Sequence, residues 1–231
     1  MRPNQIKLVL PARVADAQNC AMSTPTPSGD SSSFCLLRHG QSEANVQGLI
    51  ASSPAAAYEG FGLTDVGRTQ VRVSLIAALD AGVLPRTCHV VSSPLLRARE
   101  SAAIAADVLG TTVRVDPRLA ERGFGEFELS SDEYYERVWT KDRADPAHES
   151  WGVESTQSIL GRVTALLREL HESDGSGTFL LCTHGDVASV LLCATQGLSL
   201  SQHREVGSMG NGEVRRLAAH DLTGLSGFPR E

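Results

Sequence analysis

The sequence predicts an α/β fold, a three-layer sandwich in which helices cover both faces of a mostly parallel central sheet. Two observations predict it. Short apolar runs alternate along the chain with longer segments whose apolar residues recur at helical spacing. Several of these runs end in polar or charged residues just before a helix begins, which is typical of strands in parallel sheets. Each crossover helix then buries its apolar side on the sheet.

The elements of the first half follow in chain order. An apolar run from Phe34 predicts the first strand, and the helical spacing of apolar residues after Thr64 predicts a helix over residues 65–80 that Thr64 caps. A strand over residues 88–92 leads into Ser93-Pro94, which is predicted to be an N-cap followed by proline at the first helical position.

The second half continues this alternation. A polar segment and a long amphipathic segment predict two helices, and an almost wholly apolar segment predicts a third helix that is buried in the core. Short apolar runs between and after them predict further strands. The expected ranges are helices over 131–143, 154–173 and 187–194, and strands over 112–115, 178–182 and 213–217.

Composition limits the class of protein. The chain has 231 residues, of which 41% are hydrophobic and 21% charged, and this fits one globular domain. A net charge of −6 argues against a nucleic-acid or anionic-membrane binder, whose affinity would depend on a basic face. No apolar stretch is long enough to span a bilayer. The five cysteines follow no metal-binding spacing, and their odd number favours a reducing compartment, so we expect a cytoplasmic location.

The chain divides into three segments. Residues 1–33 end in a run rich in Ser, Thr and Pro, so we expect a flexible leader. The basic residues of this leader leave organelle targeting as an alternative, and a start at Met22 would place the first strand about a dozen residues from the terminus. Residues 34–220 are expected to form the domain, and residues 221–231 a C-terminal tail.

Arg38, His39 and Gly40 are the most informative residues. They follow the first strand, where a histidine nitrogen could attack phosphorus and an arginine offers a planar fork of donors for phosphoryl oxygens. Gly40 would let the backbone approach the anion closely. Two further strand ends lead to Arg97 and His184, and ligands of open α/β sheets bind outside the carboxyl ends of the strands. We therefore expect these side chains to converge on one anion site.

Four motifs resemble those of the histidine phosphatase superfamily, which includes cofactor-dependent phosphoglycerate mutases. They are, in the family's order, Arg38 to Asn45 (RHGQSEAN), Leu63 to Gln70 (LTDVGRTQ), Ser92 to Ala98 (SSPLLRA) and Thr183 to Gly185 (THG). Their joint occurrence is far more specific than any one of them. The resemblance covers about residues 34–218 and implies a phosphoglycerate mutase-like fold.

The resemblance implies a role for each matching residue. His39 would be the nucleophile that forms a phosphohistidine, while Arg38, Arg97 and His184 would hold the phosphoryl oxygens in the transition state. No metal and no cofactor is expected. Two arginines aimed at one place would repel a cation, and no carboxylate or thiol stands at ligand spacing from the two histidines.

Glu121 stands in a family-like Leu-x-Glu pattern, and the resemblance assigns it the role of general acid, which protonates the leaving oxygen and then activates water. Glu126 and Glu128 lie close by, so a solvated acidic loop is the alternative interpretation. Ser42 and Asn45 match family positions near the bound phosphate and are expected to bind substrate, although both residue types are common in turns. The remaining histidines are expected to be ordinary core or surface residues: His89, His148, His171, His203 and His220.

Hydrolysis is expected rather than phosphoryl transfer. Mutase relatives typically carry a long insertion that covers the pocket, whereas here Phe124 to Glu128 stands only about twenty residues before Trp151-Gly152. The common phosphatase pattern is also altered at Phe127 to Leu129 and at Gly152 to Ser155, both expected on the substrate-facing side. The predicted function is a phosphomonoester hydrolase acting on a small phosphorylated metabolite. A phosphoglycerate mutase-type phosphotransferase and a non-catalytic phospho-ligand binding module are the alternatives. The sequence leaves open the substrate and whether the protein forms a homodimer.

Overall fold

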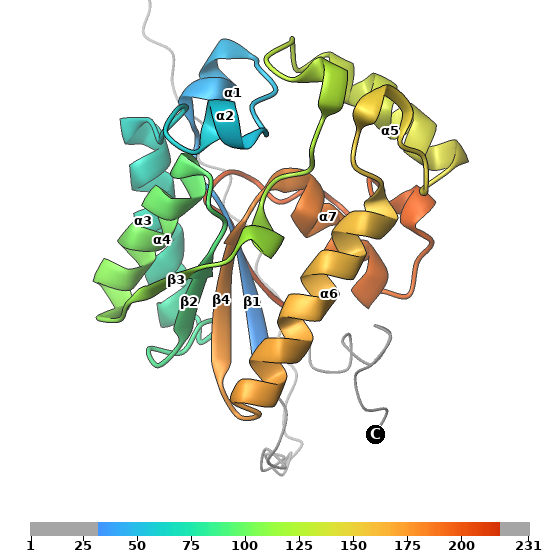
Figure 1. The fold of residues 1–231 in the computed structure, drawn as a ribbon. Coiled ribbons are helices and arrows are strands. Elements are labelled where there is room, and N and C mark those ends of the chain that lie inside the picture. Colours follow the sequence, from blue (N-terminus) through green and yellow to red (C-terminus); the bar gives the residue numbers. More distant parts are fainter. Residues whose placement is uncertain (1–31, 218–231) are drawn as a thin grey trace, which may run out of the picture.

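A computed structural model describes residues 32–217 of the chain. Within them a five-stranded sheet lies between two layers of helices, which confirms the predicted three-layer α/β fold (Figure 1). The strands are β1 (Ser33–Arg38), β2 (His89–Ser92), β3 (Val113–Val115), β4 (Thr178–Thr183) and β5 (Val214–Leu217). Their order is β3-β2-β4-β1-β5, and all neighbours run parallel except β5, which is antiparallel to β1.

Helices connect the strands and cover both faces of the sheet. They are α1 (Glu43–Gln47), α2 (Pro54–Ala57), α3 (Asp65–Asp80), α4 (Leu96–Leu109), α5 (Tyr134–Ala144), α6 (Thr156–Ser173) and α7 (Gly185–Thr195). Single 3-10 turns lie at Pro117–Leu119, Gly125–Phe127, Ser150–Gly152 and Leu200–Gln202. The short helices α1 and α2 are not among the predicted elements, because four or five residues show too little periodicity to be recognised.

Alternating side chains of β1 divide the core into two parts. Phe34 and Leu36 pack with residues of α6 and α7, while Cys35 and Leu37 pack with residues of α3 and α4. All four are fully buried. Successive side chains of a strand point to opposite faces, so a strand buried on both faces is apolar throughout. This is why the strands are visible in the sequence as continuous apolar runs.

Helix α3 has the predicted bounds and Thr64 as its N-cap, but α4 begins later than predicted. Its N-cap is Leu95, which makes no side-chain capping hydrogen bond. Ser93 is not the N-cap. Its Oγ accepts the N–H of Leu95 at 3.3 Å and bonds to Nε2 of His184 at 2.7 Å. The serine therefore shapes the turn after β2 and contacts a residue of the candidate site.

Residues 122–155, here called the cap segment, lie beyond the carboxyl ends of the parallel strands together with α1 and α2 (Figure 1). Helix α5 is the main element of the cap segment and begins three residues later than predicted. The predicted tail and residues 1–31 of the predicted leader lie outside the described residues. Of the leader's last two residues, Ser32 is buried and Ser33 already belongs to β1 and donates its N–H to the carbonyl of Gly177. None of the described helices is long and apolar enough to cross a membrane.

Candidate active site

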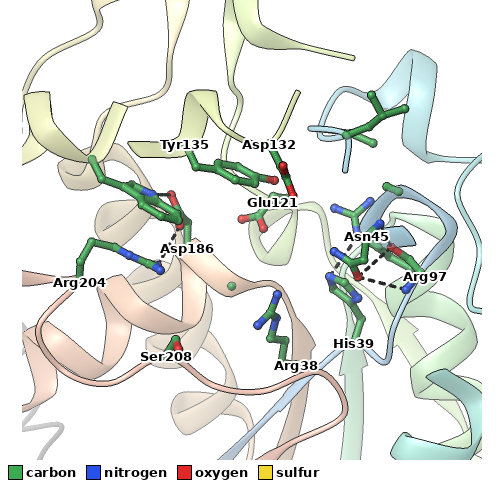
Figure 2. Close-up of a pocket in the computed structure, with 16 residues that line it drawn as sticks. Arg38, His39, Asn45, Arg97, Glu121, Asp132, Tyr135, Asp186, Arg204 and Ser208 are labelled. Atoms are coloured by element: carbon green, nitrogen blue, oxygen red, sulfur yellow. Dashed lines mark hydrogen bonds and ion pairs between the residues drawn. The ribbon is translucent and has the colours of Figure 1, made fainter. Parts of the chain in front are cut away.

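The carboxyl ends of β1, β2 and β4 meet at one edge of the sheet. Arg38 and Thr183, the last residues of β1 and β4, are direct neighbours in the ladder, and β2 pairs with the other side of β4. A cavity of about 210 Å³ opens at this edge (Figure 2). Its lining includes Arg38, His39, Ser42, Asn45, Arg97, Glu121, Asp132, Tyr135, Trp139, Asp186 and Arg204. The structure thus brings four of the five predicted catalytic residues onto one cavity.

His39 is held in the tautomer that a nucleophile needs. It follows β1 directly and is only 3% exposed. Its Nδ1 lies 2.7 Å from the carbonyl oxygen of Gly40, which can only accept, so Nδ1 carries the proton. Nε2 then carries a lone pair, to which Nε of Arg97 donates at 3.1 Å. Burial, and then the charges of Arg97 and Arg38, lower the pKa of His39 well below its usual value, so the ring is neutral at pH 7.

Arg38 and Arg97 each have an N–H donor that makes no hydrogen bond to any described residue. Arg97 lies in the first turn of α4, is 5% exposed, and its Nη1 has no hydrogen-bond partner. Arg38 donates from Nη1 to the carbonyl oxygen of Met209, while its buried Nε has no partner. Buried donors without acceptors are costly. A phosphoryl group would supply the missing acceptor oxygens to donors that are already in place.

His184 lies next to His39 but is not among the residues that line the cavity. It follows β4 at the N-cap of α7, and its ring centroid is 5.1 Å from that of His39. Its Nε2 bonds to Oγ of Ser93, and its buried Nδ1 has no partner among the described residues. Burial, and then the charge of Arg97, lower the pKa of His184 well below its usual value. His184 is therefore a neutral ring packed beside His39.

Glu121 lies on the cavity wall between the 3-10 turns that follow β3. Its Oε1 accepts the N–H of Arg122 at 2.9 Å. Burial, and then the nearby carboxylate of Asp186, raise the pKa of Glu121 to about 7, against the opposing charge of Arg97. A carboxyl group with this pKa is half protonated near neutral pH, so it can give a proton in one step and take one in the next.

The side of the cavity away from His39 consists of residues that sequence reasoning missed (Figure 2). Tyr135 and Trp139 of α5 stack with their ring centroids 5.3 Å apart. Both oxygens of Asp186 accept from Nε1 of Trp139, at 3.1 and 3.0 Å, and the guanidinium of Arg204 lies 3.7 Å from the Trp139 ring centroid. The one available signal was that Asp186 comes directly after the fourth motif.

Ser42 and Asn45 line the cavity and also form the capping box of α1. Oγ of Ser42 accepts the N–H of Asn45 at 3.4 Å, and Oδ1 of Asn45 accepts the N–H of Ser42 at 3.1 Å. Nδ2 of Asn211 donates to Oδ1 of Asn45 and to the carbonyl of His39, both at 3.3 Å. These bonds hold the loop after His39. Contact of Ser42 and Asn45 with substrate stays a prediction.

Gly40 is needed for a close contact between two loops. A Cβ on Gly40 would lie 2.3 Å from the carbonyl oxygen of Gly67, and a Cβ on Gly67 would lie 2.0 Å from the carbonyl oxygen of Gln41. The two glycines, from the first and second motifs, let two loops cross main chain against main chain. Chain packing requires glycine at these positions, and the approach of Gly40 to an anion stays a prediction.

Comparison with known proteins identifies the family. Residues 34–223 match the model of the histidine phosphatase superfamily, branch 1. The chain belongs to the histidine phosphatase superfamily. A glucosyl-3-phosphoglycerate phosphatase of Mycobacterium tuberculosis is 28% identical to it over 204 residues, which cover 80% of this chain and 84% of the relative.

Two further comparisons agree with this assignment. A solved structure of mycobacterial glucosyl-3-phosphoglycerate phosphatase in complex with VO3 has a TM-score of 0.67 and 26% identity, and the match covers 80% of this chain and 92% of that one. A probable phosphoglycerate mutase of Erwinia tasmaniensis is 29% identical over 177 residues, which cover 74% of this chain and 78% of the relative. The relatives of this histidine phosphatase superfamily member thus include proteins named for hydrolysis and for transfer.

The two positions where this member of the histidine phosphatase superfamily departs from the common pattern do not face the cavity. Glu128 accepts the backbone N–H groups of Ser52 and Ser53, each at 2.9 Å, and Glu154 pairs with Arg162 at 2.8 Å. Neither carboxylate lines the cavity. Their expected place on the substrate-facing side is wrong, because both are needed to satisfy donors elsewhere in the fold.

A buried group of charges joins the cap segment to the rest of the domain. Arg122 is fully buried and donates to both carboxylate oxygens of Asp142, at 2.7 and 2.8 Å, and its Nη1 also lies 3.4 Å from Asp186. Nε2 of His148 lies 2.9 Å from Asp142, and Nε2 of His203 lies 3.7 Å from it. Neither histidine lines the cavity, in agreement with their expected place in the core.

Proposed function

We propose that the protein hydrolyses the phosphomonoester of a small metabolite through a phosphohistidine at Nε2 of His39. One observation carries the proposal. A neutral histidine presents a lone pair beside two arginines that have buried donors without partners. A group with several acceptor oxygens around an electrophilic atom satisfies this arrangement, and a phosphoryl group has that shape and charge.

In the first step the phosphoryl oxygens would accept the free donors of Arg38 and Arg97. Nε of Arg97, which donates to Nε2 of His39 at 3.1 Å in this structure, would turn to a phosphoryl oxygen and release the lone pair. Nε2 would then form a bond to phosphorus in line with the breaking ester P–O bond. The proton on Glu121 would pass to the leaving oxygen, so that the leaving group departs as a neutral alcohol.

In the second step water would replace the alcohol. Glu121, now a carboxylate, would take a proton from the water as its oxygen bonds to phosphorus. The P–N bond would break, and its electron pair would return to Nε2 of His39. Inorganic phosphate would leave, with Glu121 protonated again as at the start. His184, packed beside His39 with an unpartnered buried Nδ1, would support the ring through this cycle.

We further propose that the reaction needs no metal ion. The positive charge that stabilises the phosphoryl oxygens would come from two guanidinium groups, which would repel a cation placed between them. Among residues 32–217 no group of three or more His, Cys, Asp and Glu side chains could hold a metal. A chelator is therefore expected to leave the rate unchanged.

Phosphate release from a panel of phosphomonoesters, measured with a chelator present, tests the proposal. The native protein should release phosphate, and His39→Ala should lose at least about 10³-fold in rate. His89→Ala, which changes an exposed histidine far from the cavity lining, should keep the native rate. Conversion of 3-phosphoglycerate to 2-phosphoglycerate with trace bisphosphoglycerate would identify a mutase instead. If His39 were not phosphorylated and no phosphate were released from any ester, the protein would have only a phospho-ligand binding role.

A further inference from the structure

The charges on the cavity wall are distributed unevenly. Arg38 and Arg97 stand at the end beside His39 and would be occupied by the phosphoryl oxygens. The other end, which would hold the leaving group, includes Glu121, Asp132 and Asp186. Among the described lining residues, Arg204 is the one further cation, so the leaving-group end carries more carboxyl groups than cations.

Arg204 is already matched by a carboxylate. Its Nη1 donates to Asp186 at 3.3 Å and to Oγ of Ser189 at the same distance, while its guanidinium plane lies over the Trp139 ring. Asp186 also accepts from Nε1 of Trp139 and lies 3.4 Å from Nη1 of Arg122. An anionic substrate group would have to compete with this carboxylate for the arginine.

Asp132 differs from Asp186, because its carboxylate has no hydrogen bond and no ion pair within the described part of the chain. Its main chain is nevertheless fixed. The N–H of Asp132 donates to the carbonyl of Gly48 at 2.8 Å, and the carbonyl of Asp132 accepts the N–H of Tyr135 at 3.1 Å. In Figure 2 the Asp132 carboxylate and the Tyr135 hydroxyl lie on the cap side of the cavity, near Glu121. Asp132 is exposed, so the cavity has at its edge a carboxylate without a partner among the described residues, on a main chain that is held in place.

We propose that the cavity selects phosphomonoesters whose leaving group carries hydroxyl or ammonium groups and no negative charge, and that Asp132 is the residue that enforces this selection. This inference rests on the proposed function, since it concerns the leaving-group end of the same cavity. A hydroxyl or ammonium group next to the ester oxygen can donate to Asp132. A carboxylate or second phosphate at that place meets Asp132 without a free cation to compensate.

Two matched pairs of substrates test the selection. Glycerol 3-phosphate and 3-phosphoglycerate differ by a hydroxymethyl group against a carboxylate, and phosphoethanolamine and phosphoserine differ by one carboxylate. In each pair kcat/KM should be several-fold higher for the compound without the carboxylate, because an uncompensated like charge a few ångströms away repels it even where water screens the pair. Equal values, or a preference for the carboxylates, would overturn the inference.

A substitution of Asp132 tests whether this residue causes the preference within the substrate pairs. Asp132→Asn keeps the size of the side chain and removes its charge, so kcat/KM for 3-phosphoglycerate should rise several-fold while that for glycerol 3-phosphate should fall or stay unchanged. Glu133→Gln is the matched control, since this exposed neighbour loses the same charge without lining the cavity. Glu133→Gln should keep the native ratio of kcat/KM for glycerol 3-phosphate to kcat/KM for 3-phosphoglycerate. If this ratio changed equally in both variants, the effect would come from the overall charge of the region, and the role of Asp132 would be overturned.

The inference and the proposed function fail in different ways. If hydrolysis needed His39 but showed no preference within the two matched substrate pairs, only the proposed selection against negatively charged leaving groups would be overturned. Absence of His39-dependent release from all four substrates and from nitrophenyl phosphate would overturn both.

Discussion

The two ends of the cavity are built in different ways. The phosphoryl end consists of Arg38 at the end of β1, His39 directly after it, Arg97 at the start of α4, and His184 after β4 beside them. These positions are fixed by strand pairing and by helices that are themselves buried on the sheet. The leaving-group end consists of side chains from the cap segment and from the α7 region, held by contacts between side chains that are distant in sequence. In the proposed reaction, the residues that would carry the chemistry are thus positioned by the backbone of the fold, and those that would set selectivity by side-chain pairs.

The largest expected effect is at the phosphoryl end. Arg97→Ala removes a phosphoryl donor and the hydrogen bond to Nε2 of His39, so kcat/KM should fall by about 10²–10³-fold. The charge of Arg97 also lowers the pKa of His39, so the substitution should raise that pKa and move the acid limb of the pH–rate profile to higher pH. Arg99→Ala, which changes a half-buried arginine of the same helix that does not line the cavity, should change neither quantity. An unchanged acid limb in Arg97→Ala would contradict the assigned geometry.

Glu121 connects the two ends, and its removal should affect substrates unequally. Glu121→Gln should slow hydrolysis of alkyl phosphates by about 10²-fold or more, with a much smaller loss on nitrophenyl phosphate, whose leaving group needs no proton. With a pKa of about 7, Glu121 loses its proton as pH rises through neutrality, so the native rate on alkyl phosphates should fall on the alkaline side. This alkaline fall should disappear in Glu121→Gln. Equal losses on both substrates would remove the acid role.

A third substitution affects the stability of the cap segment rather than the chemistry. Asp142→Asn leaves the fully buried Arg122 without its bidentate partner and should lower the free energy of unfolding by about 3–5 kcal/mol. Urea denaturation measures this. Glu136→Gln breaks an exposed pair with Arg143 on the same helix, so the unfolding midpoint should hardly move. If the two variants were equally stable, the buried pair between Arg122 and Asp142 would not be what stabilises the cap segment.

The smallest expected effect is a shift in pH dependence. The carboxylate of Asp186 raises the pKa of Glu121, so Asp186→Asn should lower that pKa and move the alkaline limb to lower pH, with little change in the maximum rate. A profile recorded with glycerol 3-phosphate would show this. A loss of rate at every pH without a shift of the limb would indicate that Asp186 acts only by holding Trp139 and Arg204.

The same contrast explains which parts could be predicted from the sequence. His39, Arg97 and His184 follow short apolar strands, so their motifs are local and the convergence of strand ends is a general property of parallel sheets. The bounds of α3, including its N-cap Thr64, follow from local capping and periodicity. The wall formed by Tyr135, Trp139 and Asp186 depends on the pairing of Arg122 with Asp142, across residues that carry no common pattern. This pairing depends on how the segments around Arg122 and Asp142 pack, and neither segment has a sequence pattern that predicts it.

At the crossing of Gly40 and Gly67, the atoms nearest to the place of each missing Cβ are main-chain atoms of the other loop. The main chain next to His39 is therefore held in part without any residue of the leaving-group wall. New leaving groups could be accommodated by exchanging residues such as Asp132 or Tyr135 without moving His39. Substitutions in the leaving-group wall could therefore change the substrate while the fold stays the same. A larger residue at Gly40 or Gly67 would instead displace the main chain next to His39.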